Sequence, residues 1–150
     1  MRVYLVIMDE TDEAGTALRF AARRAARTGG AVHLLALVPR QQFVAFGGIQ
    51  ATIEEEARAR AEALVTSAAG ELMADSPTPP TIAVRQGDGI DVIRNYLAEH
   101  PEVSALVLGA AANGGPGPLV NHFVGMAGQL PCPVYVIPGR LSDADLARIG

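Results

Sequence analysis

The sequence lacks lysine altogether: each of the 12 basic residues among its 150 is an arginine. Without an amine side chain the protein cannot form a Schiff base, and it lacks the lysine that binds phosphate in Walker P-loops and kinases. A response-regulator receiver domain also needs a lysine, so this class is excluded although acidic residues follow the first apolar run. Any phosphate would have to be held by backbone amides or by an arginine.

A basic stripe, a cysteine pair and a long apolar run are also missing. The net charge is −4 and the charges are interspersed, so nucleic acid is not an expected partner. The single cysteine, Cys132, excludes an internal disulfide and a cysteine-based zinc site. The first apolar run, Val3–Met8, is shorter than a signal-peptide core, and none reaches the roughly 20 residues that span a bilayer. The sequence therefore predicts a cytoplasmic protein with no membrane partner.

Short apolar runs alternate with helical patterns along the chain, of which 49% is hydrophobic and 19% charged. Runs of this length are typical of strands that are buried on both faces of a parallel sheet. The expected strands are residues 3–8, 31–38, 81–85, 104–108 and 134–137. The expected helices are residues 13–28, 53–74, 90–100 and 119–129, with one or two turns after Ser142 in the tail. This order predicts one α/β domain, an open twisted five-stranded parallel sheet with helices on both faces.

Two segments follow strands in the way that binding loops do in open parallel sheets. Asp9 opens an acidic turn after the first strand, where a carboxylate can accept from a ribose hydroxyl or from a base edge. Residues 109–118 form a glycine-rich loop before a helix, and both features suit a phosphate. Pro116 and Pro118 each remove an amide donor from this loop, so a plain connector is the alternative.

The sequence gives little support for a catalytic side chain. No serine lies in a nucleophile elbow. His33 is expected to pack within a strand, and His100 to cap the end of a helix. His122 lies one turn into the helix after the glycine-rich loop, where it could meet a phosphate, although solvent exposure is the simpler interpretation. Cys132, which lies between two prolines, is expected to be a structural, half-buried thiol. The chain is therefore not expected to be an enzyme.

Several segments together resemble the universal stress protein family. They are residues 5–11, 18–23, 87–88, 106–109 and 130–134, the last of which contains a Pro-Cys-Pro-Val sequence. The resemblance covers about residues 3–138 and implies a family domain over 1–138, followed by a tail over 139–150. It also implies sheet order 3-2-1-4-5, the Rossmann-like fold of the adenine nucleotide alpha hydrolase type, a dimer and a role in stress responses.

One branch of this family binds ATP through a motif of three glycines. Two residues separate the first glycine from the second, nine separate the second from the third, and Ser or Thr follows the third. Gly109 matches the first glycine, whereas Ala112 stands at the second. Nine residues separate Gly115 from Gly125, and Met126 replaces the final hydroxyl. Losing a hydroxyl that bonds to a charged phosphate removes about 1.5–3 kcal/mol, or about one to two decades in affinity.

Carried over by resemblance, Asp9 and Leu37 would contact adenosine, while Gly109, Gly115 and Gly125 would contact phosphates. The segments 115–120 and 138–143 resemble a proteobacterial branch with a degraded ATP motif. One hypothesis is therefore a non-catalytic regulatory module that acts through unidentified protein partners, with weak or absent binding of ATP or AMP. The other is an adenine-nucleotide switch with feeble ATPase activity. An enzyme of the related hydrolase superfamily ranks last, because the expected Ser-Gly-Gly type loop is absent after the first strand.

The fifth strand offers a route to the homodimer. Strand 134–137 lies between prolines that bracket it without breaking it, so it could pair with its copy across a two-fold axis. The alternative is that the tail, residues 140–150, folds over this edge and blocks it. Phe43 and Phe46 could form a lid over the binding site or part of an interface.

Overall fold

The computed structural model describes residues 1–39, 47–76 and 78–150, so the predictions for Phe43 and Phe46 lie outside the described residues. Strands and helices alternate as the sequence predicts. The strands are β1 (Val3–Met8), β2 (Ala31–Val38), β3 (Thr81–Gln86), β4 (Ala105–Ala110) and β5 (Val134–Pro138). The helices are α1 (Asp12–Thr28), α2 (Gly47–Asp75), α3 (Gly89–Glu99), α4 (Pro118–Gly125) and α5 (Asp143–Ile149), with a 3₁₀ turn, η1 (Ala127–Gln129).

The five strands form one parallel sheet in the order β3-β2-β1-β4-β5, which confirms the predicted fold and strand order. β1 lies at the centre, and all six of its residues are buried, as its unbroken apolar sequence requires. β3 lies at an edge and is only partly buried, which explains its weaker apolar signal. The order reverses between β1 and β4, so the carboxyl ends of these strands mark the expected binding region.

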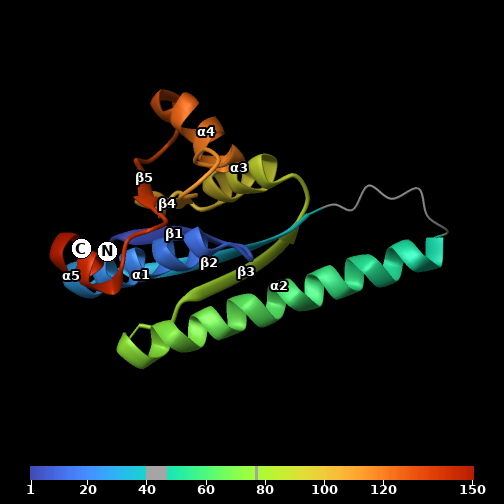
Figure 1. Ribbon diagram of the computed structural model, residues 1–150, viewed down its shortest axis with the longest axis horizontal. Coiled ribbons are helices and arrows are strands. Elements are labelled where there is room, and N and C mark those ends of the chain that lie inside the picture. The colour runs from blue at the N-terminus through green and yellow to red at the C-terminus, as the bar shows by residue number, and fades with distance from the viewer. Residues whose placement is uncertain (40–46, 77) are drawn as a thin grey trace.

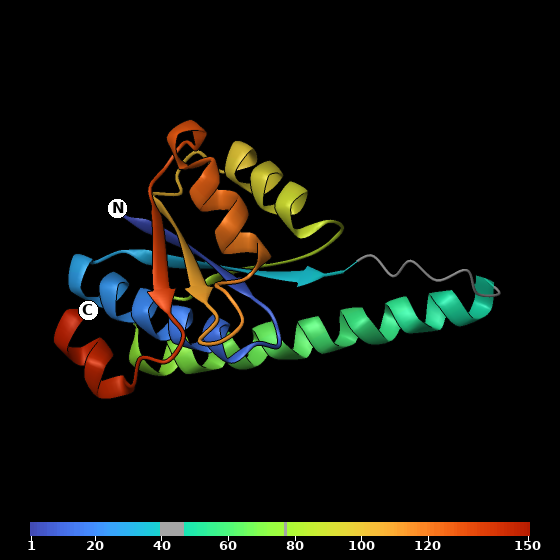
Figure 2. The same ribbon diagram turned by 45° about the horizontal axis from the view of Figure 1, so that its top comes forward.

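Helices cover both faces of the sheet (Figure 1). α1, α2 and α5 contribute to one apolar cluster against the sheet, and α3 and α4 contribute to the other. α2 has 29 residues, a length of about 43 Å, and Figures 1 and 2 show its N-terminal part reaching beyond the sheet. The sheet with its two helical layers is a Rossmann-like arrangement.

The first turn of α1 lies unusually close to the ends of β4 and β5. Thr11 caps this helix and accepts from the amide of Ala14 at 3.3 Å. A Cβ atom on Gly109 would lie 2.1 Å from the carbonyl oxygen of Glu13, and one on Gly139 would lie 2.6 Å from the carbonyl oxygen of Ala110. Glycine at both positions therefore lets the helix backbone rest directly on the strand ends.

Three boundaries differ from the sequence prediction by more than one residue. α2 begins at Gly47, although a loop was expected as far as residue 52, because a long packed helix propagates through poor helix formers at its end. β4 continues through Gly109, which was expected in the loop, because its pairing with β5 extends to Ala110. The helix expected over 119–129 ends at Gly125 and is followed by η1, since glycines at 125 and 128 weaken a continuous helix.

The tail forms α5, as the capping residue predicted. The Ser142 hydroxyl accepts from the amide of Asp145 at 3.1 Å, and the Asp145 carboxylate accepts from the amide of Ser142 at 3.0 Å. Leu146 is buried in the core, and Asp143 pairs with Arg19 of α1 at 3.0 Å. The tail therefore packs on α1, and within the described chain β5 has β4 as its sole strand neighbour.

Candidate ligand-binding cleft

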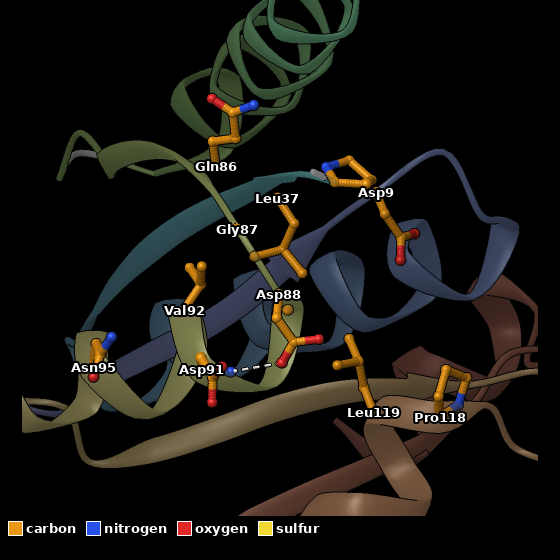
Figure 3. Close-up of a pocket in the computed structure, with 12 residues that line it drawn as sticks. Asp9, Leu37, Gln86, Gly87, Asp88, Asp91, Val92, Asn95, Pro118 and Leu119 are labelled. Carbon is orange, nitrogen blue, oxygen red and sulfur yellow. Dashed lines mark hydrogen bonds between the residues drawn. The ribbon is translucent and has the colours of Figure 1, made fainter. Parts of the chain in front are cut away.

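A cavity of about 700 Å³ lies at the carboxyl edge of the sheet. Its walls are the ends of β1, β2 and β3 and the first turns of α3 and α4. Figure 3 shows Asp9, Leu37, Asp88 and Leu119 around this cavity, which we call the carboxyl-edge cleft. Ligand pockets commonly have volumes of about 300–1,000 Å³, so the cleft is large enough for a small molecule.

α3 forms one wall of the cleft and begins at an acidic turn. The Gly87 amide donates to the Val38 carbonyl at 3.1 Å, which joins the end of β3 to the end of β2. Gly87 has φ 144°, a conformation that favours glycine, and it lets the chain turn directly into the helix. Asp88 then caps α3 by accepting from the Asp91 amide at 3.3 Å, the dashed bond of Figure 3. Both carboxylates consequently line the cleft.

Asp9 lies opposite this wall, directly after the buried strand β1. Its Oδ1 accepts from the backbone amide of Thr11 at 3.0 Å and also from the Thr11 hydroxyl. These bonds hold the half-buried side chain in a local turn, and no described residue bonds to its Oδ2. A carboxylate oxygen is thus left to accept from a ligand hydroxyl or amino group.

The charge of the cleft is negative. Asp9, Asp88 and Asp91 line it, and none of its described lining residues is basic. Arg60 lines an adjoining groove of about 180 Å³ and pairs with Glu10 at 3.4 Å. Carboxylates repel the phosphates of a nucleotide, but they can accept hydrogen bonds from its neutral hydroxyl and amino groups.

The point where the strand order reverses is nearly closed. The space between the ends of β1 and β4 has a volume of about 30 Å³, room for about one or two water molecules. Its walls include Glu13 and Ala14 of α1, Gly109 of β4 and Leu119 of α4. The carboxyl-edge cleft, which shares Asp9 and Leu119 with this space, offers a ligand much more room.

Comparison with known proteins identifies the family. Residues 1–138 match the profile of the universal stress protein family. The chain belongs to this family. Among curated protein sequences, none is significantly similar to this universal stress protein.

Solved structures of universal stress proteins have the same fold. The universal stress protein UspA from Lactobacillus plantarum is 20% identical, with a TM-score of 0.77, and the match covers 91% of this chain and 97% of that one. The universal stress protein from Archaeoglobus fulgidus in complex with dAMP is 21% identical, with a TM-score of 0.62 and coverage of 91% and 97%. A family protein from Arabidopsis thaliana with AMP bound is 15% identical, with a TM-score of 0.60 and coverage of 98% and 99%.

The residues that sequence analysis assigned to a nucleotide are only partly brought together in this universal stress protein. Asp9 and Leu37 both line the carboxyl-edge cleft, and Gly109 lies beside it in the closed space. Gly115 lies in the exposed loop before α4 with φ 88°. Gly125 and Met126 lie at the far end of α4, about 10 Å along the helix axis from Pro118, and Met126 packs against the core.

Sequence analysis missed the α3 wall of the cleft. Asp88 was noticed as part of a family-like segment, but its position beside Leu37 depends on β3 lying next to β2. Asp91, Asn95 and Leu119 gave no signal of their own, since isolated polar and apolar residues at a helix start are common. Hydrogen bonding that joins the end of β3 to the end of β2 is a tertiary feature that no local pattern reports.

The remaining candidate groups mostly behave as expected. The ring Nδ1 of His100 lies 2.9 Å from the carbonyl oxygen of Tyr96 at the end of α3, which confirms its capping role. Cys132 is half-buried, and burial raises the pKa of its thiol, as expected of a structural residue. The exposure expected for His122 is wrong: the side chain is half-buried with Nε2 fully covered, because its ring packs against the ring of Phe123 at 5.1 Å.

Among the described residues, no three His, Cys, Asp or Glu side chains gather in a way that could hold a metal ion. None of the helices in the described ranges is both long and apolar enough to cross a membrane.

Proposed function

We propose that this universal stress protein is a non-catalytic, cytoplasmic regulatory module of the stress response that acts as a homodimer and binds ATP weakly or not at all. The observation that carries the proposal is the carboxyl-edge cleft, whose described lining contains three carboxylates and no basic side chain. Such a cleft can accept hydrogen bonds from a ligand but repels a triphosphate.

Adenine nucleotides are the class of ligand that we test first. Solved universal stress proteins contain AMP, dAMP or cAMP, and the cleft of this chain combines Leu37, an apolar surface for a base, with Asp9, an acceptor for ribose. The phosphates would meet a loop in which Pro116 and Pro118 have no amide donor. We therefore assign the chain to the proteobacterial branch with a degraded ATP motif, and we expect the nucleoside part to supply what affinity there is.

An adenine-nucleotide switch with feeble ATPase activity is the second candidate. It is favoured by the loop before α4, where Gly114, Gly115 and Gly117 all have positive φ. Glycines in this conformation can turn their amides toward an anion. The loop would have to close over the cleft for a phosphate to reach these amides.

The homodimer is proposed through the outer edge of β5. This edge strand has one described neighbour, and Val136 is 37% exposed on it. An open apolar edge favours pairing with a second copy, and a two-fold axis would place two β5 strands antiparallel to each other. α5 packs on α1, and we propose that it leaves this edge free to pair.

Calorimetric titration of the purified protein with adenosine, AMP, ADP and ATP tests the proposal. We expect no measurable heat with millimolar ATP, and any binding to be strongest for adenosine and weaker with each added phosphate. Tight binding of ATP with release of ADP would overturn the proposal and support the nucleotide switch. Tight binding of ATP without hydrolysis would overturn the weak-binding part alone.

A further inference from the structure

A buried histidine joins the sheet to α3 on the face that α3 and α4 cover. His33 of β2 is 8% exposed, and its Nδ1 lies 2.8 Å from the hydroxyl oxygen of Tyr96, which is 1% exposed. The ring of His100 stacks on the ring of Tyr96, with 3.9 Å between centroids and 15° between planes. His33, Tyr96 and His100, which we call the His–Tyr cluster, fasten the C-terminal half of α3 to β2.

The charged groups that act on His33 lie in the segment after α3 and not on the neighbouring strands. Leu5 of β1 and Thr81 of β3, its neighbours in the sheet, carry no charge. His100, whose ring centroid lies 6.0 Å from that of His33, and Glu102 both act on it electrostatically from the segment after α3, in opposite directions.

An arginine completes the surroundings of the cluster. Arg85 of β3 lies over the ring of Tyr96 at 5.0 Å and pairs with Glu99 at 2.9 Å. Burial has the largest effect on His33 and disfavours its charged form, whereas Glu102 acts in the opposite direction. Protonation is thus poorly accommodated in the closed cluster because His33 is only 8% exposed.

We propose that protonation of His33 releases α3 from β2 and thereby opens the α3 wall of the carboxyl-edge cleft, so that the fold contains a pH-sensitive switch. A neutral imidazole can accept the Tyr96 hydroxyl proton at Nδ1, whereas an imidazolium has to donate there to the Tyr96 oxygen, so protonation reverses this bond. The protonated ring would place a positive charge at a site that is only 8% exposed. The cost of burying this charge favours a state in which α3 has moved away and His33 meets water.

The cluster and the cleft are joined by a short, rigid connection. α3 has 11 residues, and two of them, Val92 and Asn95, line the cleft (Figure 3). Val92 lies four residues before Tyr96, and Asn95 lies directly before it. Val92 and Tyr96 therefore lie on the same side of the helix one turn apart. A movement of α3 at Tyr96 has to move this wall as well.

The direction of the pH dependence follows from burial. Burial lowers the pKa of His33 from its ordinary value of 6.5, so the opened state takes up the proton more readily than the closed state. The opening equilibrium is constant above about pH 6.5. Below it, opening rises by up to about tenfold per pH unit, until the pH reaches the lower pKa of the closed state.

Hydrogen exchange of the ligand-free protein tests this switch. Exchange of the α3 amides, corrected for the intrinsic effect of pH, is measured from pH 8 to pH 5 in the wild type, in His33→Gln and in His100→Gln. Gln keeps a hydrogen-bond acceptor for Tyr96 but does not titrate. We expect the rise in opening below pH 6.5 in the wild type and in His100→Gln, and its loss in His33→Gln.

Three results would overturn the switch. One is a rise that persists in His33→Gln, and another is a rise that disappears in His100→Gln. The third is simultaneous loss of protection in α3 and in β1, since that would be global unfolding and not release of α3. If His33→Gln does not fold, an NMR titration of the ring signals of the three histidines in the wild type replaces it. His33 has to stay neutral below pH 6.5, and titration of its ring at or above pH 6.5 would refute the switch.

Discussion

At the scale of single residues, carboxylates decide what the carboxyl-edge cleft can bind. Asp9 is held by Thr11 and Asp88 by the first turn of α3, so each charge has a defined position at the cleft. A fixed carboxylate lowers the affinity for an anion because it cannot move away from it. The same oxygens can accept hydrogen bonds from uncharged parts of a ligand.

Replacing Asp88 by Asn should raise the affinity for AMP relative to the wild type. The amide keeps the size of the side chain and a capping oxygen for α3, but removes one negative charge from the cleft. Removing one charge several ångströms from a phosphate, partly screened by water, is worth about 1 kcal/mol, or roughly fivefold in affinity. Calorimetry at fixed ionic strength measures this change.

A matched variant controls for the change in net charge. Asp145→Asn removes a carboxylate of the α5 capping box, which is not among the residues that line the cleft, and it should leave nucleotide affinity unchanged. Equal gains in both variants would show that net charge alone is responsible. A loss of affinity in Asp88→Asn would show that this carboxylate binds the ligand directly.

His33 should also make global stability depend on pH. Burial lowers the pKa of His33 in the folded state, so the unfolded chain takes up the proton first as the pH falls. The free energy of unfolding should therefore be largest above about pH 6.5, and should decline below it. Urea unfolding at pH 7.5 and pH 5.5 measures this decline, which should be smaller in His33→Gln; an equal decline in both would assign it to other groups.

At the scale of elements, the contact of α1 with β4 sets the geometry of the binding edge. The backbone of Glu13 lies where a side chain on residue 109 would be, and Leu119 of α4 lines the same small space. Close packing of these elements leaves a small space between β1 and β4, and the wider cleft lies toward β2, β3 and α3.

Gly109→Ala should destabilise the protein by about 1–3 kcal/mol or more, because its Cβ would lie 2.1 Å from a backbone oxygen that cannot move independently. Gly70→Ala is the control: it lies within α2, where a Cβ meets no atom within 4 Å. This substitution should stabilise the helix by about 0.5–1 kcal/mol. Urea unfolding distinguishes the two, and a harmless Gly109→Ala would refute the close packing of α1 on β4.

At the scale of the whole molecule, the two sheet edges differ. β3 lies at one edge and β5 at the other, and α5 packs against α1. An unpaired edge that is not covered by another element is free for a second copy. The homodimer would join two sheets into one continuous sheet across the two-fold axis.

Val136→Glu should convert the homodimer to a monomer, since a two-fold axis would bring two carboxylates close together in the new interface. Val124→Glu is the control, because Val124 is 52% exposed and belongs to α4, outside the proposed strand pairing. Light scattering after gel filtration should show twice the monomer mass for the wild type and for Val124→Glu. A monomeric wild type would contradict the proposed dimer.

Local sequence determined the elements of this protein and the residues that begin its helices. Unbroken apolar runs specify buried strands, and the side chains of Thr11 and Ser142 specify helix starts, because each depends on near neighbours alone. The same patterns, with the family resemblance, were sufficient to predict the sheet order and to place Asp9 and Leu37 at one site.

Only the tertiary structure decided the shape and charge of that site. β3 had to lie beside β2 before Asp88 could join Asp9 and Leu37 around one cleft. Likewise, α1 had to rest on β4 before Gly109 acquired its close contact with Glu13. Each of these contacts joins residues that are distant in sequence, and their distances depend on packing of whole elements, which no local pattern of residues encodes.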